Sequence, residues 1–201
     1  MSSIQQINSQ AFSNIAFVKY WGKFGRQYPC NPSISMPIPQ CRTFCSMDYE
    51  LVPSEKAGVI EFLFENEPHE KFKERIEEYL LSIEDVYPLA RKLRLSIRTS
   101  NNFPHSAGIA SSASAFAAIA KCLVGIEKTL DQNTEQSAKE ETQRASMLAL
   151  LASGSACRSL SDSEFTIWGE SKLDMASTNE YTEDIELTDE QKEKMGWPLI
   201  D

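Results

Sequence analysis

The chain has 201 residues, enough for one large domain or two small ones with a core of ordinary size. Its net charge of −9 argues against nucleic acid as a partner, and an acidic protein that binds anions must concentrate its positive charge locally. The five cysteines form no Cys-x-x-Cys pair and only two histidines are present, so we expect buried free thiols rather than a zinc site. Since the start lacks an apolar h-region and no run approaches a membrane span, we expect a cytoplasmic protein without membrane contact.

The first element is predicted at residues 13–18 (SNIAFV), which have the composition of a short buried strand. The cluster KYWGK at residues 19–23 follows directly, with two lysines around a Tyr-Trp-Gly turn in which Gly22 permits unusual backbone angles. Such a turn is either a solvated corner with an aromatic staple or a cationic corner that binds a diphosphate.

Strands and one helix are predicted next. The proline-containing segment 31–37 (NPSISMP) should lie at a sheet edge, because proline removes a backbone donor. Residues 43–51 alternate as a strand and 59–64 read as a second one, so we expect an antiparallel pair. Apolar residues from Phe72 to Ile83 follow at helical spacing after Pro68, and this helix carries Arg75 as a candidate substrate contact.

A strand at 93–99 leads into NNFPHSAGIASSASAFAA at 101–118, a polar loop that enters an alanine-rich helix from Ser112 to about Gly125. Unpaired N–H groups at a helix start and the helix dipole favour an anion, and the hydroxyls of Ser111 and Ser112 can contact phosphate or Mg²⁺. The loop is neither a P-loop nor a dinucleotide fingerprint. A capped helix with small residues for close packing explains the same letters.

A second helix is predicted at 137–151, where Ser137 and Glu140 form a capping-box pattern. It ends in SGSACRS at 153–159, in which the rigid guanidinium fork of Arg158 suits a carboxylate or phosphate. A Gly-Ser loop with a surface arginine is the common alternative. Residues 164–169 (EFTIWG) predict one more strand, and the acidic residues 171–194 predict a loop with a short helix.

The loop PHSAGIASSA at 104–113 resembles the ATP-binding loop of the GHMP small-molecule kinases. NIAFVKYWGK, NNFPHSAGIASSAS and SGSACRS, in this order and with NPSIS and WGE, are similar to the N-terminal domain of diphosphomevalonate decarboxylases. The resemblance implies an α+β fold, the N-terminal domain of the two-domain GHMP kinase fold, with a ribosomal-protein-like sheet and helices packed on one side. It implies such a domain at 1–170, followed at 171–201 by an acidic connection and the start of a C-terminal domain.

The implied activity is that of a lyase of isoprenoid biosynthesis, a branch of lipid metabolism: ATP and mevalonate 5-diphosphate give isopentenyl diphosphate, ADP, phosphate and CO2. ATP and Mg²⁺ are the implied cofactors. Family members are commonly homodimers, which leaves a homodimer open here.

The resemblance also implies roles for residues. Arg158 would orient the substrate carboxylate, and Ser111 would contact Mg²⁺. The other implied substrate contacts are Lys19, Tyr20, Trp21, Gly22, Lys23, Ser153, Gly154, Ser155, Ala156 and Cys157, with Arg75 and Asn14 as weaker assignments. The implied nucleotide contacts are Pro104, His105, Ser106, Ala107, Gly108, Ile109, Ala110, Ser111 and Ser112.

Three departures qualify these expectations. His105 stands where the family usually has threonine or a small residue, and Ala115 where it has glycine, which bears on ATP affinity. The family's catalytic aspartate belongs to a DAGPN-like motif that this sequence lacks, so we expect an incomplete chain that cannot turn over alone. The alternatives are a related GHMP-type kinase, a phosphomevalonate decarboxylase, or a truncated non-catalytic paralogue that binds nucleotide.

Overall fold

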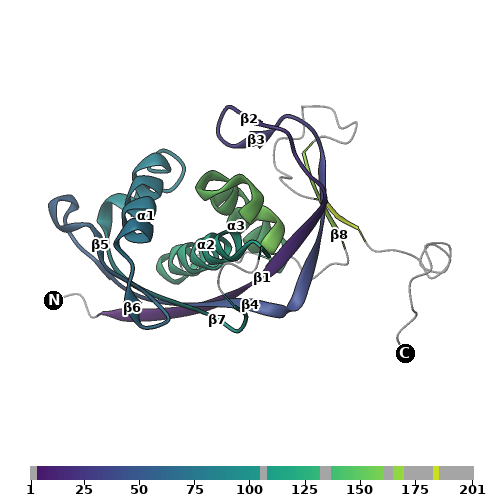
Figure 1. The fold of residues 1–201 in the computed structure, drawn as a ribbon. Helices are drawn as coiled ribbons and strands as arrows, with labels where there is room; N and C mark the ends of the chain where they lie inside the picture. The colour runs from purple at the N-terminus through teal and green to yellow at the C-terminus, as the bar shows by residue number, and fades with distance from the viewer. Residues whose placement is uncertain (1–3, 105–107, 132–136, 161–164, 170–182, 186–201) are drawn as a thin grey trace.

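The computed structural model describes residues 4–104, 108–131, 137–160, 165–169 and 183–185. Its helices lie together on the concave side of a curved sheet, as Figure 1 shows. These helices are α1 (Glu70–Ser82), α2 (Ser111–Leu130) and α3 (Ala138–Ala152). The arrangement confirms the expected α+β fold with helices on one side.

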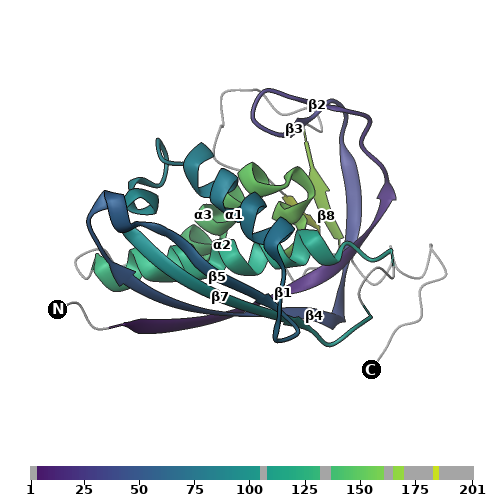
Figure 2. The ribbon, with the colours of Figure 1, turned by 60° about the vertical axis from the view of Figure 1, so that its left-hand side comes forward.

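The main sheet is built on one long strand, β4 (Ser33–Leu51). Its strand order is β6-β5-β7-β4-β8-β9, and β1 pairs with the opposite edge of β4. The other strands are β1 (Gln5–Val18), β5 (Gly58–Phe64), β6 (Glu67–Pro68), β7 (Leu93–Asn101), β8 (Phe165–Trp168) and β9 (Glu183–Ile185). A small hairpin of β2 (Lys23–Phe24) and β3 (Tyr28–Pro29) lies above the end where β1, β4 and β8 meet (Figure 2). The 3₁₀ turns are η1 (Ser54–Lys56), η2 (Pro88–Lys92) and η3 (Gly154–Ser159).

The proline-containing segment does not lie at an edge, so that prediction is wrong. Ser33 to Ser35 pair with β8 while β1 pairs along the opposite side, and Pro37 lies opposite Asn14 within β4. The strand tolerates the proline because, along β4, pairing with β8 stops at Ser35 and pairing with β7 starts only at Thr43. Between these points β1 is the one described neighbour, so the missing N–H can face the unpaired side.

The predicted antiparallel pair of 43–51 and 59–64 is also wrong. β7 lies between them, antiparallel to β4 and parallel to β5. The chain leaves β5, passes through β6 and α1, and returns as β7, and a crossover of this kind joins parallel strands. Alternation cannot identify a strand's neighbour.

Several element predictions are confirmed with shifted ends. β7, β8, α1, α2 and α3 occupy the predicted segments, and α3 has the predicted capping box of Ser137 and Glu140. Pro68 lies in β6, and the N-cap of α1 is His69. The strand predicted at 13–18 extends back to Gln5, and Ile15 and Phe17 on its outer face are exposed. Of the predicted acidic loop and short helix, the described part is strand β9; the rest lies outside the described residues.

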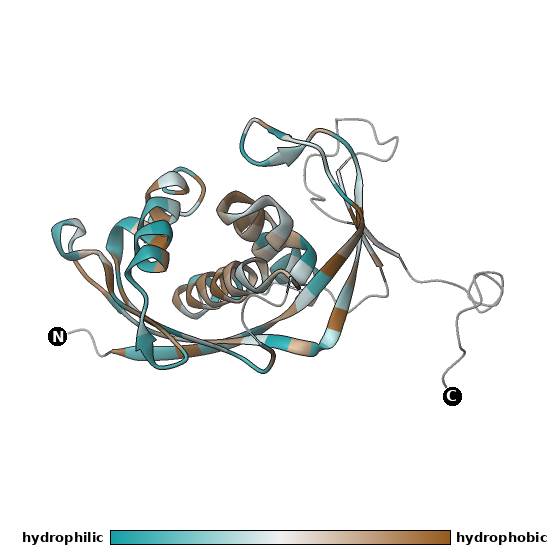
Figure 3. Ribbon diagram, in the orientation of Figure 1, coloured by the Kyte–Doolittle hydropathy of each residue, from teal (hydrophilic) through white to brown (hydrophobic). Residues whose placement is uncertain are grey.

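The core lies between the helices and the sheet, with α2 at its centre. Phe116, Ile119 and Leu123 of α2 are fully buried in the same cluster as Met47 of β4 and Ile97 of β7. Figure 3 shows α1 as more hydrophilic than α2, which fits a helix that covers only one edge of the sheet. The cysteines are free, as expected, but Cys30 is exposed, so burial holds for Cys45, Cys122 and Cys157 only. No described helix has the length and apolar content needed to cross a membrane.

Candidate functional site

The most unusual polar side chain is Arg158, which lies on η3 between α3 and β8. It is only 4% exposed. Its Nη1 donates a hydrogen bond to Ser33 Oγ (2.5 Å), and its guanidinium lies 5.4 Å from the Trp168 ring centroid. Burial lowers the pKa of Arg158, and no Asp or Glu among the described residues forms an ion pair with it. Because an uncompensated buried charge is costly, this guanidinium is suited to an anionic ligand.

Two strands supply a polar floor beneath this arginine. In the β4–β8 register, Ser33 lies opposite Trp168 and Ser35 opposite Thr166, and all four residues are buried. On these two strands and the arginine, four buried polar atoms lack a hydrogen-bond partner within the described part of the chain: Ser35 Oγ, Thr166 Oγ1, Trp168 Nε1 and Arg158 Nε. Buried polar groups are normally satisfied, so their concentration around one arginine is typical of a site that binds a polar ligand.

The KYWGK turn reaches the same region. The Tyr20 ring meets the Trp168 ring edge-on, with centroids 4.7 Å apart. Lys23 Nζ lies 5.7 Å from the Tyr20 ring centroid and donates to Gln27 Oε1 (2.7 Å). Gly22 has φ +82°, as expected of a sharp turn. Lys19, Trp21 and Lys23 are exposed, so the lysine charges remain available for an anion.

The segment 153–159 is a buried 3₁₀ turn rather than a surface loop. Ser153 ends α3, and a Cβ on Gly154 would lie 2.7 Å from the Trp168 ring and 2.9 Å from the Gln27 carbonyl oxygen, so this position requires glycine. Ser155 is half-buried, and Ala156 and Cys157 are buried. The Cys157 thiol donates to the Gly154 carbonyl (3.0 Å), and burial raises its pKa to about 12. This thiol is therefore an inert packing group.

Asn14 connects this turn to the sheet. It is 2% exposed on β1, and its Nδ2 donates to Ser159 Oγ at 2.7 Å. Segments of β1, β4 and β8, which are far apart in the sequence, thus meet at the turn that carries Arg158.

A hollow of about 330 Å³ lies between α1 and the start of α2, apart from the Arg158 region. Its lining residues are Phe62, Phe64, His69, Phe72, Arg75, Thr99, Asn101, Ser111, Ser112 and Ala115. α2 begins at Ser111 after Gly108 (φ +77°) and Ala110 (φ +52°), without a side-chain cap. The Ala113 and Ser114 N–H groups donate to the Ala110 carbonyl. The N–H groups of Ser111 and Ser112, which precede them, have no carbonyl partner within the helix and can bind an anion together with the serine hydroxyls.

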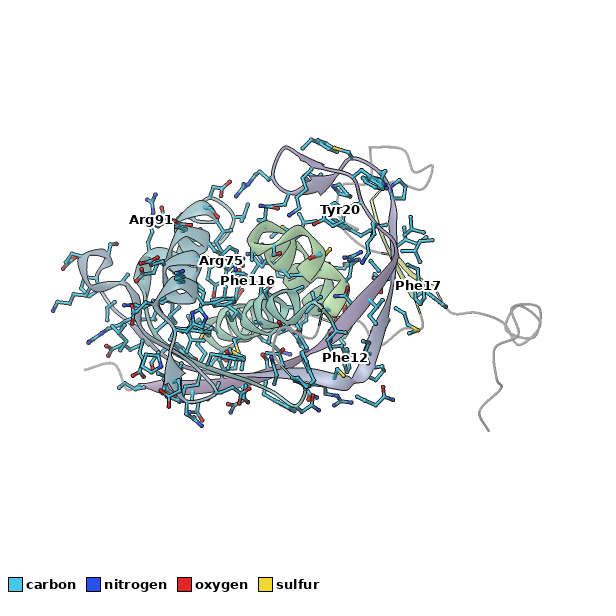
Figure 4. All side chains as sticks on the ribbon, viewed as in Figure 1. Phe12, Phe17, Tyr20, Arg75, Arg91 and Phe116 are labelled. Atoms are coloured by element: carbon cyan, nitrogen blue, oxygen red, sulfur yellow. The ribbon has the colours of Figure 1, made fainter. Side chains whose placement is uncertain are left out.

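The other wall of this hollow is aromatic. Phe62, Phe64 and Phe72 line it. Phe72 stacks on Phe62 (4.9 Å) and on the buried Phe116 (5.0 Å), and the Arg75 guanidinium lies 5.3 Å from the Phe72 ring centroid. Figure 4 shows Arg75 and Phe116 close together and Tyr20 apart from them, toward the β2–β3 hairpin. Thr99 Oγ1 is buried and lacks a partner among the described residues. Apolar aromatic surface beside a cation and a helix start can hold a planar, phosphorylated ligand.

The predicted site residues therefore form two groups. Arg158, Tyr20, Lys23, Asn14 and the 153–157 segment converge, whereas Arg75 lies in the hollow with Ser111 and Ser112. Ile109 and Ala110 are half-buried and Pro104 is exposed; His105, Ser106 and Ala107 lie outside the described residues. No three His, Cys, Asp or Glu side chains in the described part of the chain are grouped to hold a metal ion.

From the sequence, Asn31, Ser33 and Ser35 of the NPSIS segment could either line a polar pocket or finish a turn, and the structure places Ser33 and Ser35 in the buried polar floor beside Arg158. Sequence reasoning assigned no role to Trp168 of the WGE segment. The signal for Ser33 and Trp168 was two small motifs far apart in the sequence, and only their pairing across β4 and β8 brings them to Arg158. The aromatic wall and Thr99 gave no signal, because such residues in strands and helices normally belong to a core.

Comparison with known proteins decides the family. The family described as "Diphosphomevalonate decarboxylase-like N-terminal domain" matches residues 11–179. The chain belongs to this family. The diphosphomevalonate decarboxylase of Saccharomyces cerevisiae is 33% identical over 161 residues, which cover 73% of this chain and 37% of the yeast protein.

Solved structures agree with this membership. The mevalonate diphosphate decarboxylase of Staphylococcus aureus has 27% identity and a TM-score of 0.69, covering 96% of this chain and 53% of that one. The structure of MDDEF in complex with MVAPP, AMPPCP and magnesium has 25% identity and a TM-score of 0.68, covering 91% of this chain and 51% of that one. The fold implied by the resemblance is confirmed, and the chain spans about 40% of the length of the yeast relative and half of these structures.

Proposed function

We propose that this chain forms the substrate- and nucleotide-binding half of an enzyme that decarboxylates mevalonate 5-diphosphate with ATP. The observation that carries the proposal is Arg158, a buried guanidinium without an acidic partner among the described residues. Its neighbours come from the segments that resemble the decarboxylases. A related protein has been solved with MVAPP, AMPPCP and magnesium, which supports the same ligands here.

The chemistry needs an oriented carboxylate. Phosphate transfer from ATP converts the tertiary C3 hydroxyl into a leaving group. As the C3–O bond breaks, positive charge develops at C3, the C1–C2 bonding pair becomes the C2–C3 double bond, and C1 leaves as CO2. In our proposal the Arg158 fork holds the C1 carboxylate so that the C1–C2 bond is aligned for cleavage, and positioning of this kind is a large part of catalysis.

The diphosphate end would lie at the KYWGK turn. Lys19 and Lys23 supply positive charge, and the Tyr20 to Gly22 turn faces the segment from Ser153 to Cys157, whose backbone and hydroxyl groups can donate to phosphate oxygens. Asn14 supports that segment through Ser159. The site concentrates cationic groups in a protein with net charge −9, as the composition requires.

The nucleotide would occupy the hollow beside α2. The aromatic wall of Phe64 and Phe72 suits a base, and the loop from Pro104 to Ala110 with Ser111 and Ser112 suits the phosphates. We propose Ser111 Oγ as a Mg²⁺ ligand, and the ion supplies neutralisation of phosphate charge when it is bound. We reassign Arg75 from the substrate to the nucleotide, since it lines this hollow.

The deciding experiment is titration calorimetry of the chain with mevalonate 5-diphosphate and, separately, with Mg²⁺ and a non-hydrolysable ATP analogue. We expect both ligands to bind. Arg158→Met should lower the affinity for mevalonate 5-diphosphate at least tenfold without changing the affinity for the nucleotide. Ser112→Ala is the matched variant, which should weaken the nucleotide only. Failure of the parent chain to bind either ligand would overturn the proposal.

Turnover assays separate the alternatives. Without the DAGPN-like aspartate we expect no CO2 when the chain meets ATP, Mg²⁺ and 1-¹⁴C-labelled mevalonate 5-diphosphate. ADP released without CO2 would indicate a kinase. Tighter binding of mevalonate 5-phosphate than of the diphosphate would indicate a phosphomevalonate decarboxylase.

A further inference from the structure

We infer that Trp168 is a positioning residue that fixes the distance between the two ends of the substrate site, an inference that rests on the proposed function. Its indole contacts one side chain from each proposed binding segment. The Tyr20 ring meets it edge-on at 4.7 Å, and the Arg158 guanidinium lies 5.4 Å from its centroid. The diphosphate-binding turn and the carboxylate-binding arginine thus share one support.

Trp168 itself is held from several directions. It is 1% exposed, it lies opposite Ser33 in the β4–β8 register, and it clusters with Leu150 and Cys157. On a further side it touches the backbone of Gly154, where a Cβ would come within 2.7 Å of the ring. A large side chain enclosed in this way has a single rotamer, so the groups that rest on it acquire defined positions.

Arg158 needs such a support because its long side chain is intrinsically flexible. The hydrogen bond to Ser33 Oγ fixes only Nη1, and the guanidinium could still rotate about this one hydrogen bond. Contact with the indole restricts the plane of the guanidinium. Nε, which has no hydrogen-bond partner within the described residues, then keeps a defined direction for a carboxylate. Preorganisation of this kind raises affinity by removing an ordering cost from binding.

Trp168 also fixes the position of Tyr20. Edge-to-face contact holds its ring at the start of the KYWGK turn, and Lys23 Nζ lies over the same ring at 5.7 Å. The indole therefore also orders the turn that we propose to bind the diphosphate. A ligand with an anion at both ends should depend on Trp168 more than a ligand with only one.

The test compares Trp168→Phe and Trp168→Leu using mevalonate 5-diphosphate and isopentenyl diphosphate, which lacks the carboxylate. Trp168→Leu should lower the affinity for mevalonate 5-diphosphate about tenfold or more and the affinity for isopentenyl diphosphate about threefold. The preference for the ligand that carries the carboxylate therefore falls. Trp168→Phe keeps an aromatic face and should restore both affinities to within about threefold of the parent. Leu95→Ala is the control, because it removes core volume in β7 away from both sites.

A ligand-independent measurement accompanies these titrations. The ¹H–¹⁵N signals of the Arg158 guanidinium, assigned by their loss in Arg158→Lys, should show slow rotation in the parent and in Leu95→Ala. In Trp168→Leu they should average. This readout follows the order of the arginine and not the stability of the fold.

The outcomes are distinguishable. If Trp168→Leu keeps the parent's preference and the slow guanidinium signals, or if Leu95→Ala loses as much preference as Trp168→Leu, the inference is overturned. If the parent binds neither ligand, the proposed function fails, and the guanidinium signals alone decide whether Trp168 orders Arg158.

Discussion

At the scale of single residues, the site depends on the absence of side chains as much as on their presence. Gly154 has no Cβ, so Trp168 can approach its backbone, and Arg158 then lies against that ring. Polar atoms without a hydrogen-bond partner among the described residues are concentrated around the arginine. In the same segment, the Cys157 thiol is hydrogen-bonded and its pKa is raised. In our proposal, ligand binding therefore belongs to Arg158 and its strand neighbours rather than to Cys157.

Gly154→Ala tests this close packing. The added methyl group must displace Trp168, so we expect a loss of about 1–3 kcal/mol in the free energy of unfolding, measured by urea denaturation. Ser155→Ala in the same turn is the control and should cost under about 1 kcal/mol. Equal effects of the two substitutions would contradict the packing argument.

The buried Cys157 thiol predicts a pH dependence of stability. Its pKa is raised from 9.0 to about 12 by burial, so above pH 9 the unfolded chain loses this proton while the folded chain retains it. The unfolded state then binds fewer protons, and stability must fall as pH rises, by about 1.4 kcal/mol per pH unit once the unfolded thiol is ionised.

Urea denaturation between pH 8.5 and 10.5 measures this slope. We expect the free energy of unfolding of Cys157→Ala to fall less steeply with rising pH than that of the parent. Replacement of the exposed Cys30 by alanine should leave the slope unchanged. Parallel slopes for the parent and Cys157→Ala would show that the thiol ionises equally in both states.

At the scale of elements, the helices follow local rules and the strands do not. α3 begins where the pattern predicts, because Ser137 Oγ accepts from the Glu140 N–H and the Glu140 carboxylate accepts from the Ser137 N–H. β4, by contrast, contains two prolines, which local rules place at an edge. Its position follows from the strands that end on either side of those prolines.

Ser137→Ala should remove the N-cap of α3 and cost about 1 kcal/mol of stability, measured by chemical denaturation at pH 7. Glu140→Gln keeps an acceptor for the reciprocal bond and is the milder matched variant. The Glu140 pKa is lowered by its bonds to Ser137, so this contribution is present at neutral pH and declines as acid protonates the carboxylate. A Ser137→Ala protein as stable as the parent would exclude a contribution from the cap.

At the scale of the whole molecule, the inner face of the sheet is apolar in one half and polar in the other. Near α2 its inner face is apolar, as in Met47 and Ile97. Near Arg158 the inner face is polar, with Ser33, Ser35 and Thr166, and apolar side chains of β1 such as Ile15 and Phe17 are exposed on the outside. The half with the buried polar floor is the one that we propose to bind the ligand, and we expect it to contribute less to folding than the half that packs on α2.

Phe17→Lys tests this division. Phe17 is 57% exposed and has a tilted ring contact with Phe165 at 6.0 Å, so the substitution should cost at most about 1 kcal/mol and should raise solubility in a polyethylene glycol precipitation assay. Met47→Lys in the other half, at a fully buried position, should prevent folding. A large loss of stability from Phe17→Lys would mean that the outer face belongs to the folded core.

The sequence by itself determined the helices, the turn at Gly22, the entry of the Gly- and Ser-containing loop into α2, and the family, because each depends on residues close together in the chain. Only the tertiary structure decided that β7 separates β5 from β4, that Pro37 lies within a long strand, and that Arg75 joins the hollow beside Ser111. It also brought Trp168 and Ser33 to Arg158. The physical reason is that strand pairing and side-chain convergence are contacts between distant residues, and local periodicity carries no information about which distant residue will be the partner.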